Sequence, residues 1–417
     1  MAEAYGTGAE AGLDPASGPG PDHAAWQAFC DALKAAGDRI LESDFPTAPE
    51  DRAEGFRHLA QQAVCWLTWG VGHLDPQDPR FMRQNDLLTR WGGPNVDNVY
   101  KHARIDDDGV YRIRGLMHSC EEFLLALRIG NMHQEKYGTL HEVTATDLGI
   151  GPGDAFELVL GGPEPAAEDP AVRWIPLPPG TRMVAIREYY YDWRETEPAV
   201  FTIERLDTRD PVSAPPPPRL SPVRMAEQLH EARSQFERSI TYWNDYQRAA
   251  RARGDDNTFI QPRTEPKGLK GLVYGFCFYR LAPGEALVVE CEAPVARYWS
   301  YQLYQLGWFE PVESIHRTGG LNHRQTAVDP DGRVRVVVAH ADPGSANWLD
   351  TEGRPEGMLT FRCAWSDNRP EPTARVVRLD ELPGVLGPDG AGGTVAPARR
   401  AAHIAARRAN AAWRFRT

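Results

Sequence analysis

Apolar residues recur with the spacing of an amphipathic helix in three parts of the chain. The first stripe runs through residues 24–42, and the second follows the capping pattern of residues 47–50. The third follows Ser221 and Pro222, a pair typical of a helix start. Most of the remaining sequence consists of short apolar runs between turn residues, which is the pattern of β-strands. We therefore expect a mainly β fold with helical segments.

This order of elements occurs twice. Tyr100 and Arg187 are followed by Tyr274 and Arg362 at corresponding places, 174 and 175 positions later. A shift this constant indicates an internal duplication of units of roughly 150 residues. The strand pattern predicts two duplicated β-sandwich or jelly-roll-like lobes, each led by a helix, with one more helix at the N-terminus. Function is then expected between the halves, or where one half has departed from the other.

Five segments follow from this pattern. Residues 1–22 are rich in Gly, Ala and Pro and are predicted to be a disordered lead. Residues 23–214 hold the N-terminal helices and the first repeat, residues 215–220 are a stiff proline-rich linker, and residues 221–385 hold the second repeat. Residues 386–417 are a basic tail rich in Ala and Arg. We interpret this tail as a terminal helix on an acidic body rather than as a membrane or nucleic-acid contact.

Composition narrows the class of partner. The chain of 417 residues has a formal charge of −12, which argues against nucleic acid because phosphate binding needs clustered Lys and Arg. No apolar run approaches the length of a membrane span. The six cysteines are scattered without a Cys-x-x-Cys pair, so we expect reduced thiols and a cytoplasmic protein. The oligomeric state is left open.

The second half also carries a set of short segments in a fixed order. These are residues 280–290, 296–300, 328–332, 340–344, 347–349 and 356–362. Together they resemble the bacterial family of unknown function numbered 1214, whose members often carry a related N-terminal part numbered 1254. The resemblance implies a β-rich, two-lobed architecture. It implies nothing about a reaction.

One group of polar residues is confined to the second half. Strand alternation in residues 334–340 places His340 at the end of an apolar face, and Asp342 and Asn347 follow, whereas the matching part of the first half ends in glycines. We hypothesise that His340 transfers protons, that Asp342 orients it, and that Asn347 with Arg317 polarises a substrate. The alternative is a hydrogen-bonded turn, since Asp-Pro-Gly is turn chemistry.

Aromatic side chains are dense enough to form a binding surface. The candidate substrate-binding residues are Trp299, Tyr301, Tyr304 and Tyr191, together with His316 and His323 from a loop rich in Gly and Asn. The aromatics could line a pocket for an apolar or ring-bearing ligand, or they could fill the interface between the lobes. Both interpretations stay open.

We predict no cofactor and no metal. His316 and His323, with His340 and Asp342, could supply two or three ligands to a divalent ion, but their spacing fits no standard zinc pattern. The sequence also lacks a Gly-rich phosphate loop and a Gly-x-Ser-x-Gly elbow. A metal-dependent enzyme is therefore the weaker alternative.

Arg187 and Arg362 occupy equivalent strand positions, and Arg362 lies opposite the apolar face of its strand. Such an arginine could clamp a carboxylate or a phosphate. Because both halves keep it, an ion pair with a repeated aspartate is the simpler interpretation. The candidate partners are Asp192 and Asp367, or Asp207 and Asp380.

The sequence as a whole favours an enzyme that acts on a small, largely apolar or aromatic metabolite. The expected chemistry is cofactor-independent acid–base catalysis of the lyase, hydrolase or isomerase type. The pocket is expected in the second lobe, beside His340. The alternative is a non-catalytic protein that binds a small molecule or takes part in an assembly.

Overall fold

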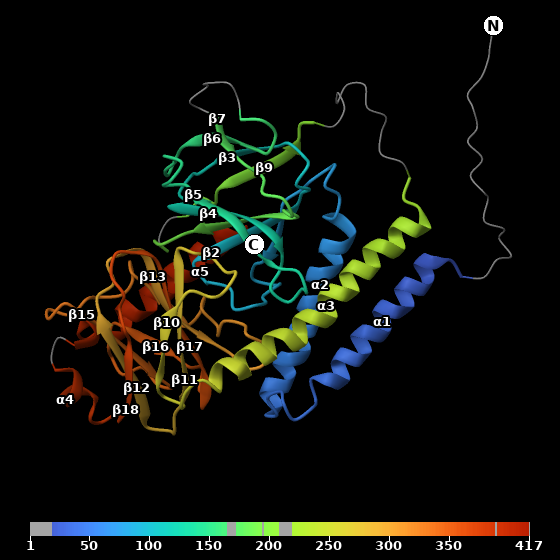
Figure 1. Cartoon of the computed structure of the whole chain (residues 1–417). Coiled ribbons are helices and arrows are strands. Elements are labelled where there is room, and N and C mark those ends of the chain that lie inside the picture. The colour runs from blue at the N-terminus through green and yellow to red at the C-terminus, as the bar shows by residue number, and fades with distance from the viewer. Residues whose placement is uncertain (1–18, 165–171, 194–195, 208–218, 388–389, 417) are drawn as a thin grey trace, which may run out of the picture.

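The computed structural model describes residues 19–164, 172–193, 196–207, 219–387 and 390–416. Most of the predicted N-terminal lead, and all four linker prolines, lie outside the described residues. Figure 1 shows two β-rich lobes, with three long helices along one side of the molecule. The expected fold class, a mainly β protein with two duplicated lobes and additional helices, is confirmed.

The three long helices are α1 (Pro21–Arg39), α2 (Pro49–Gly72) and α3 (Pro222–Arg251). Proline occupies the first turn of each, where its missing N–H breaks no helical hydrogen bond. Their apolar stripes, including Trp66 of α2 and Trp243 of α3, pack into a cluster that also takes in residues of both lobes. None of the described helices is both long and apolar enough to cross a lipid bilayer.

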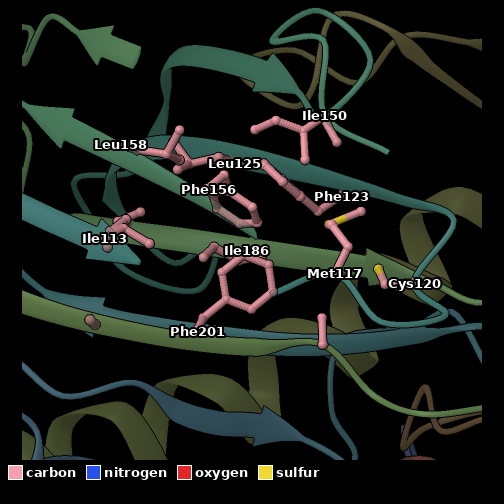
Figure 2. Close-up of a cluster of buried hydrophobic side chains, with 14 of the residues drawn as sticks. Ile113, Met117, Cys120, Phe123, Leu125, Ile150, Phe156, Leu158, Ile186 and Phe201 are labelled. Carbon is pink, nitrogen blue, oxygen red and sulfur yellow. The ribbon is translucent and has the colours of Figure 1, made fainter. Parts of the chain in front are cut away.

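The first lobe is a sandwich of two sheets. The five-stranded sheet has the order β1 (Met82–Asn85), β2 (Asn98–Arg104), β8 (Met183–Tyr189), β4 (Glu122–Gly130), β5 (Gly138–Thr144). The four-stranded sheet has the order β7 (Val172–Ile175), β6 (Ala155–Leu160), β3 (Tyr111–Leu116), β9 (Val200–Arg205). Figure 2 shows the core of this lobe, where Phe123, Phe156 and Ile186 come together from both sheets.

The second lobe repeats this topology, with every strand number raised by nine. The five-stranded sheet has the order β10 (Phe259–Arg263), β11 (Leu272–Arg280), β17 (Glu356–Ser366), β13 (Ala296–Tyr304), β14 (Gly320–Asn322). The four-stranded sheet has the order β16 (Trp348–Asp350), β15 (Arg333–Ala339), β12 (Glu285–Glu292), β18 (Thr373–Arg378). Even the parallel pair recurs, β6 with β7 and β15 with β16. Two short helices follow, α4 (Leu382–Leu386) and η1 (Gly390–Gly392).

Strand alternation decides which side chains enter the two cores. In β8, Val184 and Ile186 point into the first core, so Arg187 points away from it. In β17, Phe361 points into the second core, so Arg362 points away. The outward faces of the two five-stranded sheets meet each other and α3 between the lobes. Residues of both repeats therefore line the same space.

The tail helix α5 (Pro397–Phe415) lies between the two lobes (Figure 1). Its buried Arg407 donates a 3.1 Å hydrogen bond to the Ser314 carbonyl oxygen of the second lobe. Its buried Arg414 donates a 2.8 Å hydrogen bond to the Val96 carbonyl oxygen, next to the first lobe. The tail is a helix, as expected, but two of its arginines are interior and tie the lobes together.

Candidate functional site

The predicted proton-transfer residue His340 is engaged within the second lobe. Its Nδ1 lies 2.6 Å from the Thr351 hydroxyl, and its Nε2 lies 3.2 Å from a backbone carbonyl oxygen. Asp342 accepts hydrogen bonds from the Gly344 amide at 2.8 Å and from Arg400 at 3.0 Å. The structure therefore does not pair Asp342 with His340, because both groups already have other partners.

Asn347 and Arg317, the predicted polarising groups, also have partners of their own. Asn347 is fully buried, and its side-chain amide donates to the carbonyl oxygens of Ala327 and Arg335 at 2.8 and 2.9 Å. Arg317 forms an ion pair with Asp350 at 2.9 Å. The four predicted catalytic residues do not converge on one site, and structural roles account for their contacts.

The predicted binding residues lie in different places. Trp299 and Tyr301 belong to the core of the second lobe. His316 is exposed. Tyr191 of the first lobe and His323 of the second pack against each other with ring centres 4.8 Å apart, so they help to fill the interface between the lobes.

The histidines do not gather into a metal site. In the part of the chain that the structure describes, no group of three or more His, Cys, Asp or Glu is close enough to hold a metal ion. The cysteines are free thiols, and all except Cys30 are buried. The expectation of a cofactor-free protein stays a prediction.

A cavity of about 120 Å³ lies between the lobes and α3. Its lining comes from β2, β4 and β8 of the first lobe and from β11 and β17 of the second. Trp91, Trp243, Phe276 and Phe309 supply an aromatic wall. This is one of the two places in which the duplication predicts function, namely the space between the halves.

Two equivalent Tyr–Arg pairs line this cavity. Tyr100 lies directly opposite Arg187 in the β2–β8 register, and Tyr274 lies opposite Arg362 in the β11–β17 register. The guanidinium carbon is 5.4 Å from the ring centre of Tyr100 in the first pair and 5.5 Å from that of Tyr274 in the second. Both distances are within cation–π range. The duplication has thus brought two arginines into one cavity.

Arg362 is anchored by hydrogen bonds. One guanidinium nitrogen donates to the Gln302 side-chain oxygen at 2.6 Å and to the Tyr304 hydroxyl at 2.5 Å. The other donates to the Gly93 carbonyl oxygen at 2.6 Å. Tyr304, one of the predicted binding residues, therefore holds an arginine of the cavity rather than lining the cavity itself.

Arg187 and Arg128 are held by fewer groups than Arg362. Burial lowers the pKa of Arg187, but the phenols of Tyr274, Tyr100 and Tyr189 raise it overall, and Tyr274 also forms a side-chain hydrogen bond with it. The Nε of Arg128 is buried with no hydrogen-bond partner among the described residues. Both side chains are half-buried and line the cavity.

Carboxylates do not neutralise these arginines. In the described residues, neither Arg187 nor Arg362 forms the predicted ion pair with a repeated aspartate. Asp207 and Asp380 instead pair with arginines two positions before them in the chain. The acidic lining residue Glu265 accepts a 3.3 Å hydrogen bond from a tyrosine on α3. The predicted pairing with Asp207 and Asp380 is therefore wrong.

His102 of β2 lies on the same side of the cavity. Its exposed fraction is 4%, and its Nδ1 has no partner among the described residues. Burial and the charges of Arg128 and Arg187 hold the pKa of His102 well below its usual value, so the imidazole is neutral at neutral pH. Burial and the charge of Arg187 also lower the pKa of Arg128 to about 10, which leaves it protonated. The site is therefore enclosed and positively charged.

Two glycines let the aromatic wall approach the cavity. Gly92 and Gly93 have φ angles of +67° and +63°, which favour glycine. A Cβ atom on Gly93 would lie 2.3 Å from the Phe309 ring, and one on Gly92 would lie 2.7 Å from the Trp243 ring. Side chains at these two positions would push the wall outward.

The repeat pattern of the sequence contains part of this site. Tyr100 and Arg187 are repeated as Tyr274 and Arg362, and repetition by itself favours a structural role for all four. Arg128 and His102 belong to no motif, so nothing local in the sequence singled them out. The signal that could have found them is a comparison of the two halves in strand register.

Comparison with known proteins identifies a family region without an assigned function. Residues 279–368 match the family described as a protein of unknown function, DUF1214. This confirms the resemblance of the C-terminal half, whereas the expected N-terminal partner family numbered 1254 is not shown. No curated protein matches the chain.

Two solved structures match most of the chain. A protein from Vibrio parahaemolyticus is 11% identical, covers 82% of this chain and 100% of its own, and has a TM-score of 0.43. An uncharacterized protein from Burkholderia cenocepacia is 30% identical, covers 86% of this chain and 98% of its own, and has a TM-score of 0.77. The chain therefore belongs to the same family as the uncharacterized Burkholderia cenocepacia protein.

Proposed function

We propose that the protein binds a small organic anion in the cavity between its lobes. The anionic group contacts Arg128 and Arg187, and an apolar or aromatic body lies against Trp243 and Phe309. One observation carries the proposal. Three arginines line one partly open cavity, and no carboxylate of the described residues is paired with any of them.

The physical reason is the cost of a cation that has lost part of its hydration. A protein interior replaces the hydration of a guanidinium group only where it supplies acceptors. Arginine meets carboxylates and phosphates through two parallel hydrogen bonds, which makes it the usual side chain for recognising these groups. A ligand anion would supply an acceptor for the buried Nε of Arg128 and a counter-charge for Arg187, whose partner Tyr274 is neutral.

The proposal keeps the small, apolar or aromatic ligand that the sequence favours. It adds a negative charge to that ligand, and it puts the binding site between the lobes instead of in the second lobe. The cytoplasmic location and the absence of nucleic-acid or membrane partners stay predictions.

Native mass spectrometry tests the proposal. The protein is incubated with a mixture of aromatic carboxylates and aromatic phosphates, desalted, and examined as wild type and as Arg187→Met. We expect a bound compound on the wild type and its loss from the variant. Arg408→Met, which removes an exposed arginine of α5, is the matched control and should retain the compound. Equal occupancy of wild type and Arg187→Met would contradict the proposal.

A second candidate function is acid–base catalysis on the bound anion, with His102 as the proton-transfer group. The observation that favours it is the Nδ1 of His102, which lies at the cavity without a hydrogen-bond partner in the described residues. A neutral imidazole can accept a proton, and the negative charge of a bound ligand would stabilise the imidazolium that forms. His102 is better situated for this role than His340, whose two nitrogens already have partners.

Substitution of His102 separates catalysis from binding. Compounds retained by the wild type are incubated with wild type and with His102→Gln, and products are followed by mass spectrometry. Catalysis predicts turnover by the wild type, and binding without turnover by the variant. Unchanged compounds on the wild type would leave binding as the function and would reject the catalytic candidate.

A further inference from the structure

The two lobes can be compared position by position because their strands pair in the same register. On β4 of the first lobe, Arg128 lies opposite Met183. On β13 of the second lobe, Tyr304 lies opposite Met358. Arg128 is therefore the first-lobe counterpart of Tyr304.

A second substitution accompanies the first. His102 lies two positions beyond Tyr100 on β2, and Phe276 lies two positions beyond Tyr274 on β11. The equivalent Tyr–Arg pairs fix this correspondence, so His102 is the counterpart of Phe276. The first lobe thus has a cation and an imidazole at positions where the second lobe has a phenol and a phenyl ring.

These differences change what the equivalent arginines can bind. In the second lobe, Tyr304 accepts a hydrogen bond from Arg362 and helps to occupy its guanidinium group. In the first lobe, the same position holds Arg128, which has no acceptor atom to offer Arg187. Arg187 instead has a hydrogen bond with Tyr274 of the second lobe, and the Nε of Arg128 is buried without a partner among the described residues. An anion from outside the chain would supply the acceptor that Arg128 lacks and a counter-charge for both arginines.

We propose that the first lobe forms the head-group site of this cavity and that the head group is a dianion, such as a phosphate monoester or two adjacent carboxylates. Arg128 and Arg187 neutralise its two charges, and His102 donates a hydrogen bond to one of its oxygens. Arg362 is a positioning residue that holds the Gly93 turn and the aromatic wall. This inference rests on the proposed function and adds the charge of the ligand to it.

The charge of the head group is matched to Arg128 and Arg187, because the guanidinium group of Arg362 is already held by three acceptors of the protein. A monoanion between Arg128 and Arg187 would leave one guanidinium without a counter-charge beside another cation. The repulsion between the two is visible in the pKa of Arg128, which burial and the charge of Arg187 lower to about 10. A dianion removes this repulsion and supplies more acceptor oxygens than a single carboxylate does.

Isothermal titration calorimetry at pH 8 tests the assignment with three aryl probes. Phenyl phosphate is a dianion at this pH because the second pKa of such esters is about 6. Phthalate is a dicarboxylate, and benzoate is the matched monoanion. We expect the wild type to bind at least one dianion about tenfold or more tightly than benzoate. Whether phenyl phosphate or phthalate binds more tightly then distinguishes the two kinds of head group.

Two variants that place the second-lobe residue at the equivalent first-lobe position test which side chains cause the preference for dianions. Arg128→Tyr should weaken dianion binding about tenfold or more and benzoate binding by a clearly smaller factor, because benzoate has only one charge to share between the two arginines. His102→Phe should weaken dianion binding less, roughly threefold. Thermal unfolding identifies any variant that is not folded. If Arg128→Tyr fails to fold, the head-group assignment is still tested by two measurements. These are the preference of the wild type for dianions over benzoate and the weaker dianion binding of His102→Phe.

The outcomes separate this inference from the proposed function. Equal affinity of the wild type for dianions and benzoate would overturn the head-group assignment and leave anion binding intact. The head-group assignment would also be overturned if Arg128→Tyr lowered the affinity for dianions and for benzoate by the same factor. Failure of every probe to bind the wild type would overturn the proposed function, and the head-group assignment with it.

Discussion

Arg187 and Arg362 occupy equivalent positions in the two repeats and line one cavity, yet they differ in what holds them. Arg362 is anchored by a side-chain amide, a phenol and a backbone carbonyl. Arg187 meets tyrosine rings and phenols. The duplication explains why both arginines are present. Arg362 has three hydrogen-bond acceptors of the protein, whereas Arg187 has the Tyr274 phenol, and under the proposed function Arg187 is the one that meets the ligand.

The two arginines should therefore respond differently to replacement by methionine. Arg362→Met leaves three buried acceptors without their donor, so we expect the free energy of unfolding to fall by about 3 kcal/mol. Arg187→Met removes a half-buried cation that has a hydrogen bond with Tyr274 and no carboxylate partner among the described residues, so the free energy of unfolding should fall by only about 1 kcal/mol. Urea denaturation of the ligand-free proteins measures both values. A large loss of stability in Arg187→Met would mean that this arginine is structural.

The fold could be predicted from the sequence because its signals are local or repeated. Apolar periodicity predicts the helices. The constant shift between corresponding residues of the two halves, such as Tyr100 and Tyr274, predicts the two lobes. The strand orders, which repeat with a constant offset, confirm the duplication.

The site could not be predicted because it forms only when the lobes meet. Arg128 ends an otherwise apolar stretch of strand, and its neighbour Arg187 is 59 positions away in the chain. His340 was favoured instead because its position at a strand end is visible in the sequence. The Thr351 hydroxyl that engages its imidazole is not predictable from strand alternation.

A buried ion pair between α2 and the second lobe should make stability depend on acid pH. His58 donates a 2.7 Å hydrogen bond to the carboxylate of Glu310. Burial alone would raise the pKa of Glu310, but the bond from His58 and the charges of Arg90 and Arg57 lower it overall. The resulting stability is complete above about pH 4.3, the usual glutamate pKa. It is lost as the pH falls through the lowered folded value.

Glu310→Gln tests this dependence. We expect a loss of about 1–3 kcal/mol in the free energy of unfolding at pH 7 and a shallower decline of stability toward pH 3. Chemical denaturation across this pH range gives both quantities. Glu237→Gln, at a half-exposed position on α3, is the control and should behave like the wild type. An unchanged acid decline in Glu310→Gln would contradict the assignment.

A buried histidine adds a second, milder acid dependence. His133 packs against Trp66 and Trp91, and its Nε2 donates to the Gln235 side-chain oxygen at 2.5 Å. Burial lowers the pKa of His133 to about 4, whereas an unfolded histidine titrates near 6.5. Between these values the unfolded state binds the extra proton. Acidification therefore lowers stability, by at most about 1.4 kcal/mol per pH unit.

Thermal unfolding between pH 7.5 and 4.5 measures the contribution of His133. His133→Gln should show a weaker fall of the unfolding temperature with pH than the wild type. His316→Gln, which changes an exposed histidine, should show the same fall as the wild type. A wild-type slope in His133→Gln would show that His133 is not buried in its neutral form.

The tail helix should stabilise the contact between the lobes through its buried arginines, of which Arg407 has an exposed neighbour as a control. Arg407 is fully buried and donates to the carbonyl oxygens of Ser314 and Gly320, whereas the next residue, Arg408, is exposed. Arg407→Met should lower the free energy of unfolding by about 2–4 kcal/mol because these acceptors lose their donor. Arg408→Met should change it by less than about 0.5 kcal/mol. Equal effects of the two substitutions in denaturant unfolding would argue against a buried α5.

The central claim is that the arginines between the lobes bind an anion from outside the chain. A crystal structure of the protein incubated with phenyl phosphate tests it most directly. The account predicts the phosphate oxygens at about 3 Å from the guanidinium groups of Arg128 and Arg187, with the phenyl ring against Trp243. A structure in which a carboxylate of the protein itself occupies these arginines, or in which the compound binds elsewhere and the cavity stays empty, would contradict it.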